Sequence, residues 1–272
     1  MTQMDSKEQR DLVRERFTRT AEVFGDFAVT NRIAEAELLA RFVKANASDR
    51  AVDLACGPGT LALRFARRVR WICGLDLTPA ILERARGKAA EANLDNLVFA
   101  IGDAQLLPFG DGMLDLAVTS YSLHHIPDPA RVIHEMARVV KRGGRVGVLD
   151  IRAPEDAKTR EINNRIERLR DPSHTRSIPR SEFEAMFASH GLRVTSVEIE
   201  EHPRSFDHWL EVAGWKRGDP EYVATRQLME STIPDDSADF HPKLARRNPE
   251  RPDEQPGINM MNTVVYIAGE KT

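Results

Sequence analysis

Apolar residues near the start of the chain recur three and four positions apart, over residues 5–24 and again over 31–45. This spacing places them along one face of a helix, so we expect two N-terminal helices. The stripe of the first helix is formed by Leu12, Val13, Phe17, Ala21 and Phe24.

After residue 50 the pattern changes to short apolar runs separated by helix-like segments. The expected strands are residues 50–56, 70–77, 96–104, 114–122, 143–151, 192–201 and 262–271. The expected helices are residues 60–69, 79–93, 129–141, 155–170 and 180–191. Strands that alternate with helices predict an α/β fold with a doubly wound, mostly parallel sheet covered by helices on both faces.

Residues 203–258 interrupt this rhythm with two helix-like pieces and a Pro-rich, charged loop. We divide the chain into N-terminal helices (1–45), a core (46–202), a helical insertion (203–262) and a last core strand (263–272). The insertion carries four large side chains that suit a substrate cavity, a dimer surface or ordinary core packing. These are Trp209, Trp215, Tyr222 and Met229.

The composition argues against a nucleic-acid or membrane role. The 272 residues carry 39 basic and 42 acidic side chains, a formal net charge of -3, which is not a basic footprint. No window approaches the roughly 20 apolar residues that span a bilayer, and the charged N-terminus lacks a signal-peptide core. Cys56 and Cys73 lie in apolar runs without metal-ligand spacing. We therefore expect buried reduced thiols, no metal site and a cytoplasmic protein.

The segment DLACGPG places Asp53, Gly57 and Gly59 between the first core strand and its helix. Glycines let the backbone approach a ligand closely, and a helix N-terminus offers unpaired N–H groups. Tight turns also use Gly-x-Gly. Ala62 stands where a dinucleotide fingerprint has its third glycine, a position that tolerates alanine, so a nicotinamide cofactor stays open.

Two further carboxylates end the second and third strands. Asp76 has the place of a residue that binds ribose hydroxyls, and Asp103 can accept a hydrogen bond from an exocyclic amine such as that of adenine. Either alone suits a surface turn or a helix cap. Together with Asp53 they lie at the ends of three successive strands, the edge where open α/β sheets bind ligands.

Residues 52–66, 74–86 and 102–150 resemble the class I S-adenosylmethionine-dependent methyltransferases. They are most similar to the group related to the ubiquinone/menaquinone C-methyltransferases, over roughly residues 10–151. The resemblance implies a seven-stranded sheet whose last strand is antiparallel and lies beside the fifth. It also implies S-adenosylmethionine as methyl donor, S-adenosylhomocysteine as product, and a lid formed by the N-terminal helices.

The resemblance also assigns roles to single positions. Its implied cofactor contacts are Asp53, Gly57 and Gly59 with the amino-acid part, Asp76 with ribose, Leu77, Asp103 and Ala104 with adenine, and Ser120 beside the methionine. Many relatives have tyrosine where this chain has Phe24, so a role carried by that hydroxyl is not expected here.

The pair His124–His125 follows the fourth strand, at the expected cofactor edge. In extended chain consecutive side chains point opposite ways, so we expect only one of the two to face the substrate. Asp150 ends the neighbouring fifth strand and can fix the tautomer of a histidine. We select His124 with Asp150 as a candidate catalytic dyad; the alternative is that the histidines only cap the next helix or line the cofactor pocket.

The segment LRDPSHTR supplies three candidate substrate contacts, Arg170, His174 and Arg176, for an anionic or oxygen-rich substrate. The alternative is a helix end whose arginines face the carboxyl-terminal dipole.

We predict a methyltransferase for a small-molecule acceptor such as a phenol, a quinone-like compound or another O, C or N nucleophile, working by in-line displacement. The Asn/Asp-Pro-Pro-aromatic tetrad of nucleic-acid amine methyltransferases is absent after the fourth strand, so we expect no nucleic-acid substrate. A homodimer is compatible with the pattern. A nicotinamide-dependent oxidoreductase and a non-catalytic S-adenosylmethionine-binding protein are the alternatives.

Overall fold

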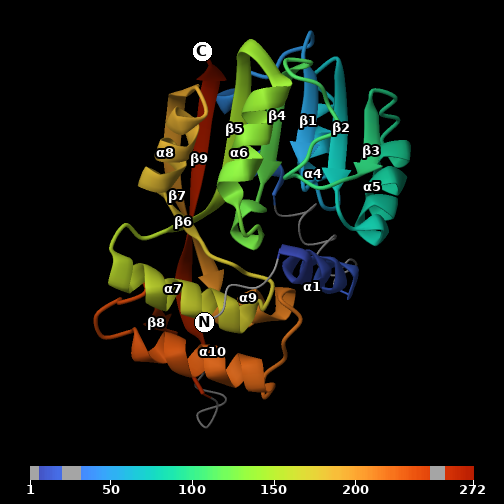
Figure 1. Ribbon diagram of the computed structural model, residues 1–272. Coiled ribbons are helices and arrows are strands. Elements are labelled where there is room, and N and C mark those ends of the chain that lie inside the picture. Colours follow the sequence, from blue (N-terminus) through green and yellow to red (C-terminus); the bar gives the residue numbers. More distant parts are fainter. Residues whose placement is uncertain (1–5, 20–31, 246–254) are drawn as a thin grey trace.

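The computed structural model describes residues 6–19, 32–245 and 255–272. Its main strands are β1 (Arg50–Leu54), β2 (Trp71–Asp76), β3 (Leu97–Ile101), β4 (Leu114–Ser120), β5 (Val140–Ala153), β7 (Leu192–Ser205) and β9 (Ile258–Lys271). They form one sheet in the order β3-β2-β1-β4-β5-β9-β7 (Figure 1). Two-residue strands, β6 (Ile178–Pro179) and β8 (Lys243–Leu244), pair with β5 and β9.

Strands β3, β2, β1, β4 and β5 pair in parallel, and β9 is antiparallel to both β5 and β7. The prediction of a doubly wound, mostly parallel seven-stranded sheet is therefore confirmed, with the last strand beside the fifth. The strand order reverses between β1 and β4, and a crevice forms at such a switch point beyond the carboxyl ends of the strands.

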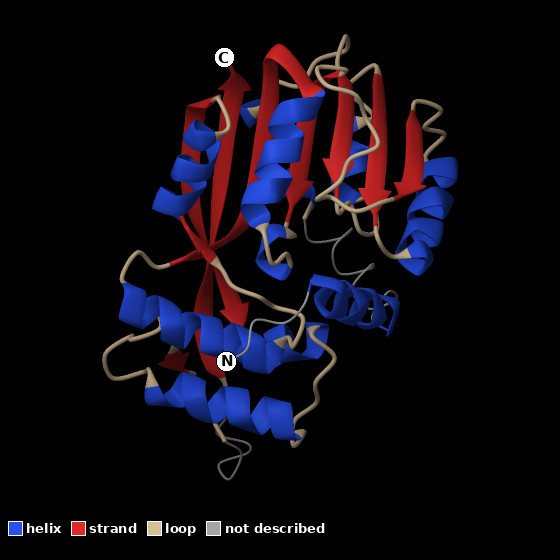
Figure 2. Cartoon of the chain, viewed as in Figure 1, coloured by secondary structure: helices blue, strands red, loops and turns tan. Residues whose placement is uncertain are grey.

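The helices are α1 (Ser6–Arg19), α3 (Ile33–Phe42), α4 (Thr60–Phe65), α5 (Pro79–Glu91), the 3-10 turn η1 (Leu123–His125), α6 (Pro129–Val139), α7 (Ala157–Arg170), α8 (Arg180–Ser189), α9 (Phe206–Val212) and α10 (Pro220–Ser231). Helices α3 to α6 and α8 lie beside the sheet, and α7, α9 and α10 lie together at one end of it (Figure 2). The helical stripe predicted for residues 5–24 is described as helix only to Arg19, and Ala21 and Phe24 lie outside the described residues.

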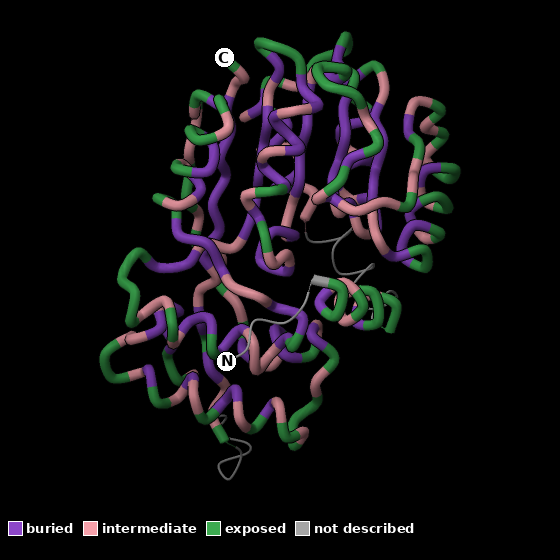
Figure 3. Tube along the Cα trace, in the orientation of Figure 1, coloured by how far each residue is buried: buried purple, intermediate pink, exposed green. Residues whose placement is uncertain are grey.

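Two apolar layers hold the sheet between its helices. One contains Met136 of α6 and Phe187 of α8, and the other contains Leu39 of α3 and Phe65 of α4. The strands are buried in the middle and the outer faces of the helices are exposed (Figure 3). This is the pattern expected of a sheet covered on both faces, and it leaves the carboxyl edge of the strands for ligands.

A third apolar cluster lies below that edge, where α7, α9, α10 and the beginning of β9 pack together (Figure 1). Trp209, Tyr222 and Met229 belong to it, and Trp215 packs against it. Strands β7 and β9 extend into this region, because their antiparallel pairing continues from Leu192 to Ser205. Helix α1 lies beside the cluster, across the ends of the parallel strands. In the described part of the chain, no helix combines the length and apolar character that a bilayer crossing requires.

Candidate active site

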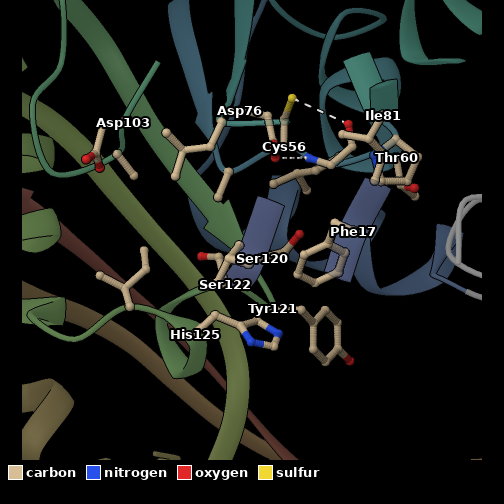
Figure 4. A pocket seen from close by; sticks show the side chains of 18 of the residues that line it. Phe17, Cys56, Thr60, Asp76, Ile81, Asp103, Ser120, Tyr121, Ser122 and His125 are labelled. Carbon is tan, nitrogen blue, oxygen red and sulfur yellow. Dashed lines mark hydrogen bonds between the residues drawn. The ribbon is translucent and has the colours of Figure 1, made fainter. Parts of the chain in front are cut away.

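A cavity opens at the carboxyl ends of β1, β2 and β4, where Figure 4 views it from close by. Of the eight residues expected to contact the cofactor, six line this cavity: Gly57, Asp76, Leu77, Asp103, Ala104 and Ser120. The structure therefore brings together side chains from four separate strand ends.

Asp53 and Gly59 lie behind the cavity wall instead. Asp53 is fully buried and accepts a hydrogen bond from the Ala62 N–H at 3.0 Å, which holds the first turn of α4. Burial raises the pKa of the Asp53 carboxyl well above its usual value. Gly59 has φ +79°, and a Cβ there would lie 3.0 Å from the Phe99 ring. Both residues shape the loop that carries Gly57 to the cavity.

Asp76 is the best-defined anionic group of the cavity. Its two oxygens accept the N–H of Gly57 at 2.9 Å and that of Thr78 at 2.8 Å. Each carboxylate oxygen keeps a further lone pair, so the pair of oxygens can accept two hydroxyl hydrogens. Burial raises the pKa of Asp76, and the backbone donors oppose that rise. This pair of acceptor oxygens fits the vicinal hydroxyls of a ribose.

Helix α1, which the resemblance implies as part of a lid, forms one wall of the cavity. Gln9, Arg10, Val13 and Phe17 line the cavity, and Arg10 pairs with Asp103 at 3.2 Å. No sequence signal marks Arg10, because it is one of several arginines on an exposed, charged helix. The other oxygen of Asp103 accepts the Gln105 N–H at 2.8 Å.

Backbone strain is present where two strands enter the cavity. Ala55 after β1 and Tyr121 after β4 have φ of 49° and 51°, in the left-handed region that a bulky residue such as tyrosine rarely adopts. The Tyr121 hydroxyl donates to Glu35 at 2.9 Å, and the Arg32 guanidinium lies 3.7 Å from the ring centroid. These contacts hold a strained residue in place, as is common at functional sites.

A second cavity adjoins the first. The two share the four wall residues Phe17, Arg32, Tyr121 and His125. The second cavity reaches from this shared wall to α7, α9 and the ends of β7 and β9. It has room for a second molecule beside whatever fills the first.

Both histidines of the pair line the second cavity, and His125 lines the first as well. The expectation that only one of them faces the substrate assumed an extended chain, and that assumption was wrong. Residues 123–125 form a 3-10 turn, not extended chain, so successive side chains turn by about 120° and not 180°. The ring centroids of His124 and His125 are 4.2 Å apart.

The expected partnership of His124 with Asp150 is present in the structure. The His124 Nδ1 and an Asp150 oxygen form a short hydrogen bond. Asp150 also accepts the N–H groups of Leu123 and Ile151 at 2.8 and 2.7 Å. Burial acts to raise the pKa of Asp150, but His124 and the backbone donors outweigh it, so that the pKa lies below its usual value. An ionised Asp150 accepts a hydrogen bond from the protonated Nδ1 of His124. Nε2 of His124 is then the ring nitrogen that can accept a proton.

His125 is held differently. Its Nδ1 lies 3.1 Å from the carbonyl oxygen of Ser173, which can only accept, so Nδ1 carries the proton. Burial, followed by the neighbouring His124, lowers the pKa of His125 to about 3. The ring is neutral near pH 7 and is a weak base.

The three candidates from residues 169–176 have different surroundings. Arg170 lines the second cavity, pairs with Glu167 at 3.3 Å and lies 4.5 Å from the Trp209 ring centroid. His174 is buried behind the cavity and bonds Asn164 at 3.1 Å through Nε2. Arg176 pairs with Glu182 in a half-exposed position and lines neither cavity.

Comparisons with known proteins agree with this geometry. The family model "Methyltransferase domain" matches residues 45–209. The methyltransferase YcgJ of Bacillus subtilis is 34% identical over 198 residues, 73% of this chain and 78% of its own length. Its crystal structure superposes with a TM-score of 0.77, covering 88% of this chain and 98% of that one, at 30% identity.

A relative whose name states its substrate matches over a shorter stretch. The 27-O-demethylrifamycin SV methyltransferase of Amycolatopsis mediterranei is 37% identical over 114 residues, 41% of this chain and 42% of its own length. Of the functions considered from the sequence, the comparisons support methyl transfer. The chain thus belongs to the methyltransferase domain family, as a class I S-adenosylmethionine-dependent methyltransferase.

Proposed function

We propose that the chain transfers a methyl group from S-adenosylmethionine in the first cavity to a small-molecule acceptor in the second. The acceptor is a phenol, a quinone-like compound or another O, C or N nucleophile. The observation that carries this proposal is the shared wall: two cavities meet at four residues, one of them lined by the Asp76 carboxylate and the other by His124, whose ring bonds Asp150 behind it. Such a wall lets donor and acceptor face each other for an in-line displacement.

On the donor side, Asp76 binds the ribose hydroxyls, Leu77 and Ala104 contact the adenine, and Asp103 accepts from its amine. The backbone at Gly57 and the side chain of Ser120 contact the methionine part. Bound S-adenosylmethionine supplies an electrophilic methyl group on a sulfonium that is already a good leaving group. The chain therefore contributes mainly alignment and the exclusion of water.

On the acceptor side, His124 is the general base when the nucleophile must lose a proton. Its Nε2 takes that proton, and Asp150 stabilises the resulting imidazolium through Nδ1–H. His125 is a weaker candidate because its pKa is about 3. We give it a positioning role at the wall between donor and acceptor.

Helix α1 excludes water from the reaction. Gln9 donates to the carbonyl oxygens of His125 at 3.1 Å and Ser173 at 2.7 Å, and Phe17 meets the His125 ring edge-on with centroids 5.3 Å apart. The helix is thereby joined to the same turn that carries the base.

The test is turnover with methyl-labelled S-adenosylmethionine over phenols, quinone precursors and amines, with S-adenosylhomocysteine affinity measured in parallel by calorimetry. The informative variant is His124→Asn, which keeps a donor toward Asp150 but loses the base. The control is His134→Asn on α6, which lines neither cavity.

We expect His124→Asn to lower kcat by about 10²–10⁴-fold and to leave the S-adenosylhomocysteine affinity nearly unchanged. Loss of that affinity at unchanged kcat would contradict the role of His124. If no panel member is methylated and the wild-type chain does not bind S-adenosylhomocysteine, the proposed function itself is wrong.

A further inference from the structure

The second cavity carries an excess of positive charge. Four arginines line it: Arg16 of α1, Arg32 before α3, Arg170 of α7 and Arg204 of β7. The acidic residues that line it are Glu167 and Asp171. Arginine is the side chain best suited to hold a planar anion through two parallel hydrogen bonds.

Two of these arginines are neutralised by nearby carboxylates. Arg16 bonds Asp171 at 2.8 Å in a pair whose side chains are 7% and 8% exposed. Arg170 pairs with Glu167 at 3.3 Å. Their charges are therefore already compensated within the protein.

Arg204 differs from them, because its guanidinium has no hydrogen bond or ion pair within the described part of the chain. Arg204 is near Arg32, and the positive charges of Arg204 and Arg170 both repel the charge of Arg32. Burial is the first cause that lowers the pKa of Arg32, and this repulsion adds to it, while Tyr121 and Glu35 oppose it. A bound anion would relieve the repulsion.

Two buried polar atoms of the same cavity also lack partners among the described residues. They are Nε1 of Trp209, whose residue is 5% exposed, and Oδ1 of Asn262. In the β7–β9 register Arg204 faces Met260, so Arg204 and Asn262 are diagonal neighbours on one face of the sheet. A buried unpaired donor and acceptor cost free energy unless a ligand or water satisfies them.

We propose that the acceptor carries a carboxylate group bound by Arg204, with the Trp209 N–H as a second donor and with a hydroxyl or amine of the acceptor donating to Asn262. This inference rests on the proposed function, because it names the acceptor class of the same site. A single uncompensated guanidinium matches a monoanion better than a phosphate dianion. Arg204, Trp209 and Asn262 line the second cavity and not the first, so the carboxylate is bound on the acceptor side.

The test is calorimetric titration of the full chain, saturated with S-adenosylhomocysteine, with benzoate, 4-hydroxybenzoate, the two matching benzamides and phenyl phosphate. The variants are Arg204→Met and Arg204→Lys, each checked by thermal unfolding. The control is Arg193→Met on the same strand, an exposed arginine that pairs with Glu270.

We expect the carboxylates to bind at least about tenfold more tightly than their amides. Arg204→Met should abolish this preference, Arg204→Lys should reduce it because the planar fork is lost, and Arg193→Met should leave it intact. Equal binding of carboxylates and amides to a chain that binds S-adenosylhomocysteine overturns this inference and leaves the proposed function standing.

A carboxylate preference that persists in Arg204→Met overturns the assignment to Arg204, and tighter binding of phenyl phosphate overturns the choice of carboxylate. Failure of the wild-type chain to bind S-adenosylhomocysteine is a different result, since it removes the proposed function on which the inference rests.

Discussion

The first cavity, proposed to bind the methyl donor (the donor cavity), and the second, proposed to bind the acceptor (the acceptor cavity), are built in different ways. The donor cavity is lined mostly by short segments that each follow one strand, such as residues 55–58, 76–77, 102–105 and 120–122. The acceptor cavity takes one to three residues from each of many distant segments, from Arg16 of α1 to Val264 of β9. If the two cavities bind donor and acceptor as proposed, cofactor binding depends on local motifs and the choice of acceptor depends on tertiary packing.

The two cavities also differ in charge. On the donor side Asp76 is held by backbone N–H groups and Asp103 by Arg10 and a backbone N–H. On the acceptor side arginines outnumber the carboxylates, and Arg204 is unpaired among the described residues. A cation-bearing donor and an anionic acceptor would each find a complementary wall.

The largest expected effect is on the pair that fixes α1 to the acceptor side. Arg16→Met leaves Asp171 buried without its cation and should lower the free energy of unfolding by about 3–5 kcal/mol. Arg14→Met on the same helix removes an exposed arginine 3.9 Å from Asp11 and should change it by less than about 0.5 kcal/mol. Urea unfolding of both variants measures the difference; equal effects would mean that α1 is not fixed by this pair.

The next prediction distinguishes the two cavities by the ligand that each is proposed to bind. Asp76→Asn removes the charge proposed to accept the ribose hydroxyls and should weaken S-adenosylhomocysteine binding by about 30–150-fold, since charge-assisted hydrogen bonds contribute about 2–3 kcal/mol. Asp95→Asn, at an exposed position before β3, is the matched control. Calorimetry should find benzoate binding unaffected by either change. An unaltered S-adenosylhomocysteine affinity in Asp76→Asn would remove Asp76 from the donor site.

The pH dependence of the free energy of unfolding tests the state of His125, which lines the acceptor cavity. The pKa of His125 is about 3 in the folded chain against 6.5 ordinarily, so as the pH falls the unfolded chain takes up this proton first. The contribution of the neutral His125 to the free energy of unfolding is complete above pH 6.5. About 2 kcal/mol of it is lost between pH 6.5 and pH 5. The depressed pKa of Asp171 acts only below its ordinary value of 3.8, outside this window.

Urea unfolding at pH 7.5 and pH 5 measures this loss. Because the buried His174 also has a pKa well below its usual value, it loses stability over the same pH range, so His125→Asn should remove only part of the pH dependence. His208→Asn, whose side chain is 58% exposed, should keep all of it. If His125→Asn loses as much stability as the wild type over this range, the neutral, buried ring is not the cause.

The smallest effect concerns the donor loop. Gly59→Ala puts an alanine into the left-handed backbone region and places its Cβ 3.0 Å from the Phe99 ring. It should therefore lower the free energy of unfolding by about 1–2 kcal/mol. Gly87→Ala in α5 meets no atom within 4 Å and should raise it by up to about 1 kcal/mol. Thermal unfolding should therefore give shifts of opposite sign, and two shifts of the same sign would contradict the loop geometry.

The same contrast explains what could be predicted from the sequence. Strand positions follow from local periodicity, and the Gly loop and the strand-end carboxylates follow from local motifs. The full set of six donor-cavity residues is what the resemblance to the class I methyltransferases implied. Arg204, Trp209 and Asn262 could not be brought together in this way, since only the long β7–β9 pairing and the third apolar cluster make them neighbours. The direction of His125 was missed because a 3-10 turn replaces extended chain there.

The most direct test of the two-cavity account is a crystal structure of the chain with S-adenosylhomocysteine. We predict the ribose hydroxyls on Asp76, the adenine against Leu77 and Ala104, and the sulfur facing the shared wall at Tyr121 and His125, with the acceptor cavity open beyond it. A ligand whose sulfur faces away from that wall, or one bound in the cavity lined by Arg204, would contradict the account.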